Sequence, residues 1–247
     1  MLRPAPIKKK EDGNRKMKKG MFMVILTLIA LMAMIMVFPI SLFAQDQVEM
    51  ADQEGDEEES VVELTADQVN YDKENDLMVF IGNVVILQED TTLTAGQASF
   101  NVDTKVGQII ENVRLIQDDI TITGETLEAF LNDKRYIFEN QVELIQERED
   151  DAGEPDNVNW LCQKLEIFTD TKNMTATGEV KITKKDYTIT AREAIYNDAE
   201  DRISLTGQVK IEEIENDRQI SGDRAVFYIS DDRLEVTGNV RSSMILD

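Results

Sequence analysis

The chain has almost none of the residues on which most catalytic and metal centres depend. Its 247 residues include no histidine, one cysteine and one tryptophan, and aromatic residues make up 6%. Without histidine there is no imidazole base for a nucleophilic triad, and zinc loses its usual nitrogen ligand. A single cysteine cannot form an intramolecular disulfide. These absences predict a protein that is not an enzyme and that holds neither a cofactor nor a metal.

Positive charge is also scarce, since 26 Lys and Arg stand against 49 Asp and Glu and the net charge is −23. Phosphate binding needs basic clusters, so we exclude nucleic acid as a partner. After residue 44 the only proline is Pro155. A sheet between residue 64 and that position would therefore keep all its backbone donors.

The N-terminal 44 residues differ in character from the rest. Lysines and arginines precede an apolar run over 21–38, and small residues follow up to Ala44. This order predicts an export signal over 1–44, for which Met17 is an alternative start. Cleavage after Ala44 and retention as an inner-membrane anchor both remain open, and either outcome leaves the body in the periplasm. The acidic stretch 45–63 is expected to be a disordered tether.

The remainder repeats one pattern six times. Each unit has a small residue, then an apolar position, a turn, and a run ending in Gly-polar-Val-polar-Ile or a variant of it. The small-residue positions are Ala66, Ala95, Gly124, Cys162, Ala191 and Gly222. The matching later positions are Gly82, Glu111, Asn140, Gly178, Gly207 and Gly238. Two markers that keep the same spacing indicate a structural repeat, interrupted by an acidic insertion over 147–157.

The second half of each unit alternates apolar and polar residues, as in Ile203, Leu205, Gly207, Val209 and Ile211. Period-two alternation predicts β-strands with one dry face. The first halves space their apolar residues three apart and then two, which favours a bulged strand. The chain is therefore predicted to be all-β, an elongated β-jelly-roll or taco of about six strand-turn-strand repeats of roughly 29 residues, with unpaired strands at its two edges.

Several residues have two interpretations. Glu111 and Asn140 replace glycine on the apparent dry face, where they would contact a polar lipid group or mark an opening to solvent. Cys162 is expected to be a buried small residue, and Asp118-Asp119 a solvated turn. Ten inward aliphatic residues form either an ordinary core or the lining of a lipid groove. These are Val84, Ile86, Val113, Leu115, Val142, Leu144, Val180, Ile182, Val209 and Ile211.

The repeats behind an export signal resemble the OstA/LptA family of periplasmic proteins. The resemblance is carried by residues 66–71 with 82–86, 191–196 with 207–211, and 225–228 with 238–240. It covers residues 64–247, which we expect to form one β domain. The acidic segment, the inserted loop and the strong acidity depart from the family pattern.

The resemblance implies a slot-like apolar interior that passes lipopolysaccharide, or a related glycolipid, toward the outer membrane. It also implies edge-strand pairing with LptC-type or LptD-type β domains or with another copy. Two alternatives stay open on the residues alone: a self-assembling β scaffold without a lipid ligand, and a carbohydrate-active enzyme on a β-helix.

Overall fold

The structure of the protein is a computed structural model. It describes residues 62–88, 90–149, 153–185, 187–214, 218–231 and 233–244. The predicted export signal and nearly all of the acidic tether lie outside these ranges. The described residues contain strands, turns and bends, and they include no helix that could span a membrane.

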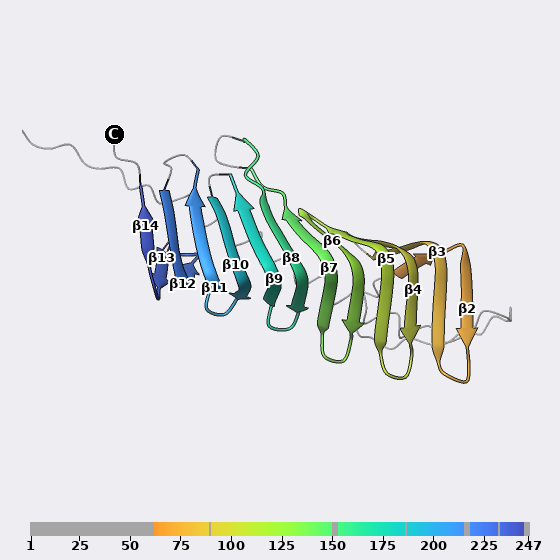
Figure 1. Ribbon diagram of the computed structural model, residues 1–247. Helices are drawn as coiled ribbons and strands as arrows, with labels where there is room; N and C mark the ends of the chain where they lie inside the picture. Colours follow the sequence, from red (N-terminus) through yellow and green to blue (C-terminus); the bar gives the residue numbers. More distant parts are fainter. Residues whose placement is uncertain are drawn as a thin grey trace, which may run out of the picture.

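The fold is a single antiparallel sheet of 14 strands, in which neighbours in sequence from β3 to β13 are neighbours in the sheet. Figure 1 shows the strands as one row that runs from β2 to β14. The strands are β1 (Val62–Thr65), β2 (Gln68–Asp72), β3 (Leu77–Gln88), β4 (Thr91–Asn101), β5 (Val106–Gln117), β6 (Ile120–Phe130), β7 (Arg135–Gln146), β8 (Val158–Phe168), β9 (Asn173–Lys184), β10 (Tyr187–Asn197), β11 (Arg202–Glu213), β12 (Arg218–Tyr228), β13 (Arg233–Thr237) and β14 (Arg241–Ser243).

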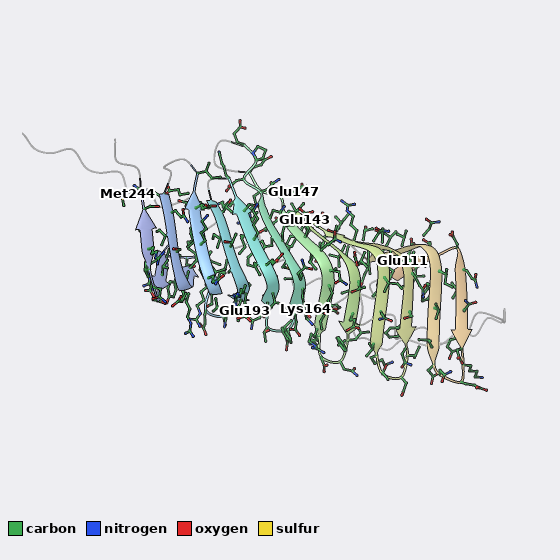
Figure 2. All side chains as sticks on the ribbon, viewed as in Figure 1. Glu111, Glu143, Glu147, Lys164, Glu193 and Met244 are labelled. Atoms are coloured by element: carbon green, nitrogen blue, oxygen red, sulfur yellow. The ribbon has the colours of Figure 1, made fainter. Side chains whose placement is uncertain are left out.

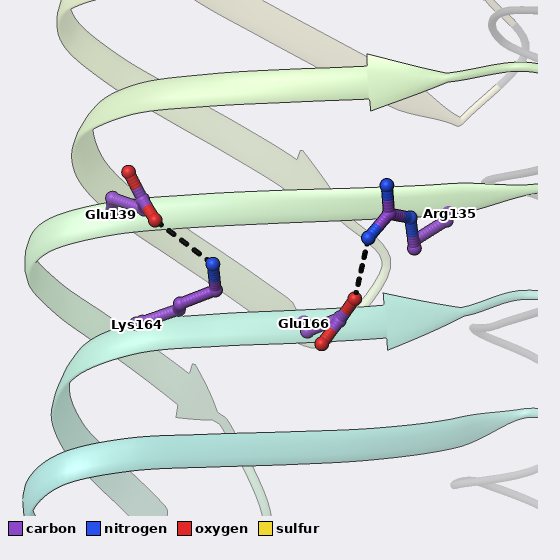
Figure 3. A network of polar contacts seen from close by, with 4 residues as sticks. All are labelled: Arg135, Glu139, Lys164 and Glu166. Carbon is purple, nitrogen blue, oxygen red and sulfur yellow. Dashed lines mark hydrogen bonds and ion pairs between the residues drawn. The ribbon is translucent and has the colours of Figure 1, made fainter.

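Each long strand is bent near its middle, where the pairing register shifts. In β3, Ile81 pairs with Gln97 and Val84 with Ala95, so Gly82 and Asn83 together oppose Gly96. Two residues opposing one is the arrangement of a β-bulge. The same shift recurs in β5, β7, β9 and β11. Figure 3 shows the ribbons of β7 and β8 turning back on themselves at this point.

The bend folds the sheet lengthwise, so that both halves of a strand face one interior. Phe80 in the first half of β3 and Ile86 in its second half belong to the same buried apolar cluster, which extends from β3 to β12. This is the predicted all-β taco. The six sequence repeats are six pairs of strands, of which the first strand of the first pair and the last strand of the sixth are split in two. The register shifts in both strands of a pair, but the extra residue lies on the odd strand, so the bulge predicted for the first half of each unit is found in its second half.

The two edge strands are split versions of the others. β1 and β2 pair with the two halves of β3, and β13 and β14 pair with the two halves of β12. Within the described part of the chain, each of these edges has a partner on one side only. Figure 2 labels Met244 at the β14 end of the row. The sheet is therefore open at both ends.

The turns at one margin of the folded sheet are hydrogen-bonded to one another. The amide of Val102 donates to Asp76 O at 2.8 Å, and the amide of Leu131 donates to Lys105 O at 3.1 Å. Thr169 and Ile229 donate in the same way to Lys134 O and Asp201 O. This series continues the sheet's ladder beyond the strand ends, and it fixes the spacing of successive units.

Candidate functional site

The ten aliphatic residues predicted to face inward all lie in the interior. They occupy the second halves of β3, β5, β7, β9 and β11, and each is at most 7% exposed. All ten belong to the single buried cluster. Since they recur at equivalent positions of five successive units, they form a continuous apolar wall along the molecule.

The opposite wall comes from the first halves of the odd strands and from the second halves of the even strands, which pair with them. Its most buried members include Phe138, Leu165 and Leu127, which are 0–1% exposed. The ten inward residues predicted from the sequence do not include these three, because that prediction used only the Gly-polar-Val-polar-Ile run of each unit. Their signal was present in the same alternation, and in the three-then-two spacing of the even strands.

The small-residue positions lie at the bend, beside the valines of the odd strands. Ala95 pairs with Val84, Gly124 with Val113, Cys162 with Val142, Ala191 with Val180, and Gly222 with Val209. At Gly222, an added Cβ would lie 2.6 Å from Cγ1 of Val236 and 3.1 Å from Thr237 O. Crowding at the bend therefore requires the small residue at this position.

The Gly-polar pairs form the outer side of the bend, which corrects the prediction that they lie on the dry face. Gly82 and Asn83 have φ of 78° and 45°, and Glu111 and Asn140 have φ of 70° and 64°. Glu111 and Asn140 are exposed at this outer corner. Consecutive left-handed residues turn the strand, so glycine and asparagine are favoured there.

The outer corner also carries a repeated hydrogen bond between neighbouring strands. The side-chain amide of Asn83 donates to Asp67 Oδ2 at 2.9 Å, and Asn239 donates to Asp223 Oδ2 at 2.9 Å. Gln141 donates to Glu125 at 3.2 Å in the third unit. In each case the residue directly after the small-residue position is acidic, and its carboxylate accepts a hydrogen bond from the amide side chain in the bulge.

Charged pairs occupy the outer faces of the strands. Figure 3 shows Arg135 on β7 paired with Glu166 on β8 at 3.0 Å, and Lys164 on β8 paired with Glu139 on β7 at 3.0 Å. These side chains are between about a quarter and two fifths exposed. Pairs of this kind contribute little each, on the order of 0–1 kcal/mol, and they give the sheet a polar exterior around an apolar interior.

Buried polar side chains lie along the inner margin where the odd strands end. Gln88, Gln117 and Gln146 are the last residues of β3, β5 and β7, and they are 3%, 0% and 6% exposed. Gln146 donates to Asp119 Oδ2 at 3.1 Å. Thr91, which lies between Gln88 and Gln117 in the register, is 2% exposed. We call Gln88, Thr91, Gln117 and Gln146 the glutamine row.

Two titratable groups of the interior have a raised pKa because they are buried. Burial raises the pKa of the Cys162 thiol to about 11, so the thiolate is disfavoured at neutral pH. Burial also raises the pKa of Tyr136 to about 12. Asp118 and Asp119 form the predicted turn, and Trp160 packs in the core near the start of β8. Among the described residues, no group of three or more Cys, Asp or Glu side chains is placed to hold a metal ion.

Both ends of the interior expose apolar side chains. At the β2 end, Val69 and Tyr71 are 52% and 41% exposed, and Val69 is in register with the buried Phe80. At the other end, Leu234 is 37% exposed and is in register with Phe227. The apolar face of the interior thus continues to both open edges of the sheet.

Comparison with known proteins agrees with this architecture. The family model of the LptA/(LptD N-terminal domain) LPS transport protein matches residues 63–111 and 97–233. The chain therefore belongs to the LptA/LptD N-terminal domain family of lipopolysaccharide transport proteins. No curated protein sequence matches it.

A solved structure with detectable similarity is LptH, the LptA homologous periplasmic component of the lipopolysaccharide transport device of Pseudomonas aeruginosa. It is 14% identical, and the match covers 76% of this chain and 96% of LptH, with a TM-score of 0.22. Because this structural overlap is small, the family assignment stands on the family model alone.

Proposed function

We propose that the protein is a non-enzymatic periplasmic carrier that shields the acyl chains of lipopolysaccharide, or of a related glycolipid, inside the folded sheet. The observation that carries this proposal is the apolar interior that runs through every unit and reaches both open edges. The ten inward aliphatic residues would form one wall of the lipid path. The family of the chain supports the same class of cargo.

The physical benefit of such a path is large and needs no reactive group. Exposing an acyl chain of a dozen methylenes to water costs about 10 kcal/mol at roughly 0.8 kcal/mol per methylene. A lipid that slides between two apolar walls avoids this cost at every step. The two walls are halves of the same bent strands, so they could separate by opening at the bend while the hydrogen-bonded ladder of the sheet stays intact.

The open edges support a bridging role. Among the described strands, the β1/β2 edge and the β13/β14 edge have a partner on one side only, so a second sheet can extend them. Pairing with an LptC-type or LptD-type β domain, or with another copy, would join two apolar interiors end to end. The exposed Val69, Tyr71 and Leu234 would be covered by such a partner.

Photocrosslinking with a matched pair of positions tests the carrier proposal. A diazirine amino acid at Leu115, 2% exposed, should label with an acylated glycolipid, whereas the same group at the adjacent, exposed Arg114 should not. Circular dichroism would show that both variants keep the β fold. Equal labelling at the two positions, or none at Leu115, would contradict the proposal.

A second candidate is a self-assembling β scaffold, which the same unpaired edges favour. It predicts filaments whose formation depends on protein concentration and is unchanged by lipid. Light scattering with and without glycolipid separates it from the carrier.

The location is tested by the mass of the chain recovered from cells, since cleavage after Ala44 would release it into the periplasm and retention of 1–44 would anchor it to the inner membrane.

A further inference from the structure

The side-chain amide of Gln117 is fully buried and has no hydrogen-bond partner within the described residues. Its exposure is 0%, and neither Nε2 nor Oε1 has a partner there. Buried polar groups are nearly always paired, because an unpaired one loses its hydration without compensation. An amide with both its donor and its acceptor unused therefore requires an explanation.

Gln117 faces the proposed lipid path. It alternates with Val113 and Leu115 on the inner face of β5, and both of these residues belong to the buried cluster. Its neighbours in the register are Thr91 on β4 and Ile120 on β6. Ile120 packs against the cluster. The Gln117 amide thus lies where the apolar wall ends and the strand reaches its turn.

The equivalent residue of the next unit shows that pairing within the protein is available at this position. Gln146 ends β7 as Gln117 ends β5, and its Nε2 donates to Asp119 at 3.1 Å. The residue that stands to Gln117 as Asp119 stands to Gln146, 27 positions earlier in the chain, is Asp90, and no hydrogen bond joins the Gln117 amide to it. Gln117 is the member of the glutamine row for which neither side-chain amide atom has a partner among the described residues.

We infer that Gln117 binds the secondary amide at the root of an N-acyl chain held in the interior. The ligand N–H would donate to Oε1. Because the N–H and C=O of a trans amide point in opposite directions, Nε2 would donate to another oxygen of the ligand headgroup and not to the carbonyl of that amide. An ester or ether could only accept hydrogen bonds and would leave Oε1 unpaired. This inference rests on the proposed carrier function, and it adds a polar contact that fixes where the headgroup of an N-acylated lipid leaves the apolar path.

Two amphiphiles that differ only at the amide nitrogen provide the test. N-lauroylglycine has an amide N–H, and N-lauroylsarcosine has a methyl group in its place. The full chain should bind N-lauroylglycine about tenfold more tightly by calorimetry, a ratio typical of one well-formed buried hydrogen bond. Gln117→Leu should abolish this preference, because the two ligands then lose the same partner.

Gln146→Leu is the matched control. The side-chain amide of Gln146 already donates to Asp119, so the preference for N-lauroylglycine should survive in this variant. Gln117→Leu should also raise the unfolding temperature without ligand, because it removes unpaired polar atoms. Gln117→Met serves the same purpose should the leucine variant fail to fold.

The outcomes separate the two proposals. Equal binding of both amphiphiles by the unmodified chain, or a preference that persists in Gln117→Leu, overturns the role of Gln117 and leaves the carrier function intact. Loss of the preference in Gln146→Leu as well would also overturn it. If the unmodified chain binds neither amphiphile and no acylated glycolipid, the carrier function itself fails.

Discussion

Gly96 on β4 lies directly against the side chain of Glu111 on β5. A Cβ atom added to Gly96 would lie 2.7 Å from the Cβ of Glu111. In the fifth unit the arrangement is reversed, since Gly207 on the odd strand lies against Arg192, whose Cβ would be 2.7 Å from an added Cβ. In one unit the glycine is on the even strand and the larger residue on the odd strand, and in the other unit the positions are reversed. The outer corner therefore accommodates only one side chain at each of these contacts.

This relationship predicts that substitutions at the two positions are coupled. Gly96→Ala should lower the free energy of unfolding by about 1–3 kcal/mol when Glu111 is present. In the background of Glu111→Gly the same change should cost much less, because the clashing side chain is gone. Urea unfolding of the two single variants and the double variant measures the coupling.

Gly124→Ala is the control for this cycle, because the nearest atom to an added Cβ is Glu139 O at an ordinary 3.4 Å. It should change stability by less than about 1 kcal/mol. Strictly additive effects of the Gly96 and Glu111 changes would show that the two residues do not compete for the same space.

The bend itself could not be located from the alternation of the sequence. Phe80 and Val84 both face inward and are separated by an even number of positions, so the period-two pattern continues across the bulge. Gly82 therefore appeared to be an inward residue, as did Glu111 and Asn140. In the even strands the bulge does change the phase, from Ala95 to Ala98, and this break was visible in the sequence.

The wall of the interior was predictable and the glutamine row was not. Repetition identified the strands and their dry faces, because burial of one face is what the alternation records. Gln88, Gln117 and Gln146 recur with the same spacing as the repeat, but polar residues at strand ends are ordinarily solvated. Only the folded arrangement reveals that these amides are buried.

Two leucines on β8 provide a test of the core that is independent of any ligand. Leu165 is 0% exposed, and Leu161 on the same strand is 40% exposed. Leu165→Ala should reduce the free energy of unfolding by about 2–5 kcal/mol, since it removes buried methyl groups and leaves a cavity. Leu161→Ala should cost clearly less. Denaturant unfolding of both variants checks the difference, and similar losses would contradict the assigned faces of β8.

Cys162 should resist thiol reagents in the folded protein. Burial raises its pKa to about 11, so at pH 8 almost no thiolate is present, and the side chain is only 5% exposed. Labelling with iodoacetamide should be slow in native buffer and rapid in urea. The denatured sample is the internal control, because it contains the same thiol without the fold. Fast labelling of the native protein would mean that β8 opens readily at the bend.

Alkaline pH should destabilise the fold through Tyr136. Burial raises the pKa of this phenol from 10.0 in the unfolded chain to about 12 in the folded protein. Between these values the unfolded state releases the proton while the folded state retains it, so stability falls as pH rises from 10 to 12. The slope from this one group is about 1.4 kcal/mol per pH unit.

In Tyr136→Phe the loss of stability over this window should be smaller by that amount, whereas the pH dependence between 6 and 8 should be the same in both proteins. Other groups titrate in the alkaline range as well, so the informative quantity is the difference between the two proteins in urea unfolding at each pH. Parallel curves across pH 10–12 would show that Tyr136 ionises as readily in the folded chain as in the unfolded one.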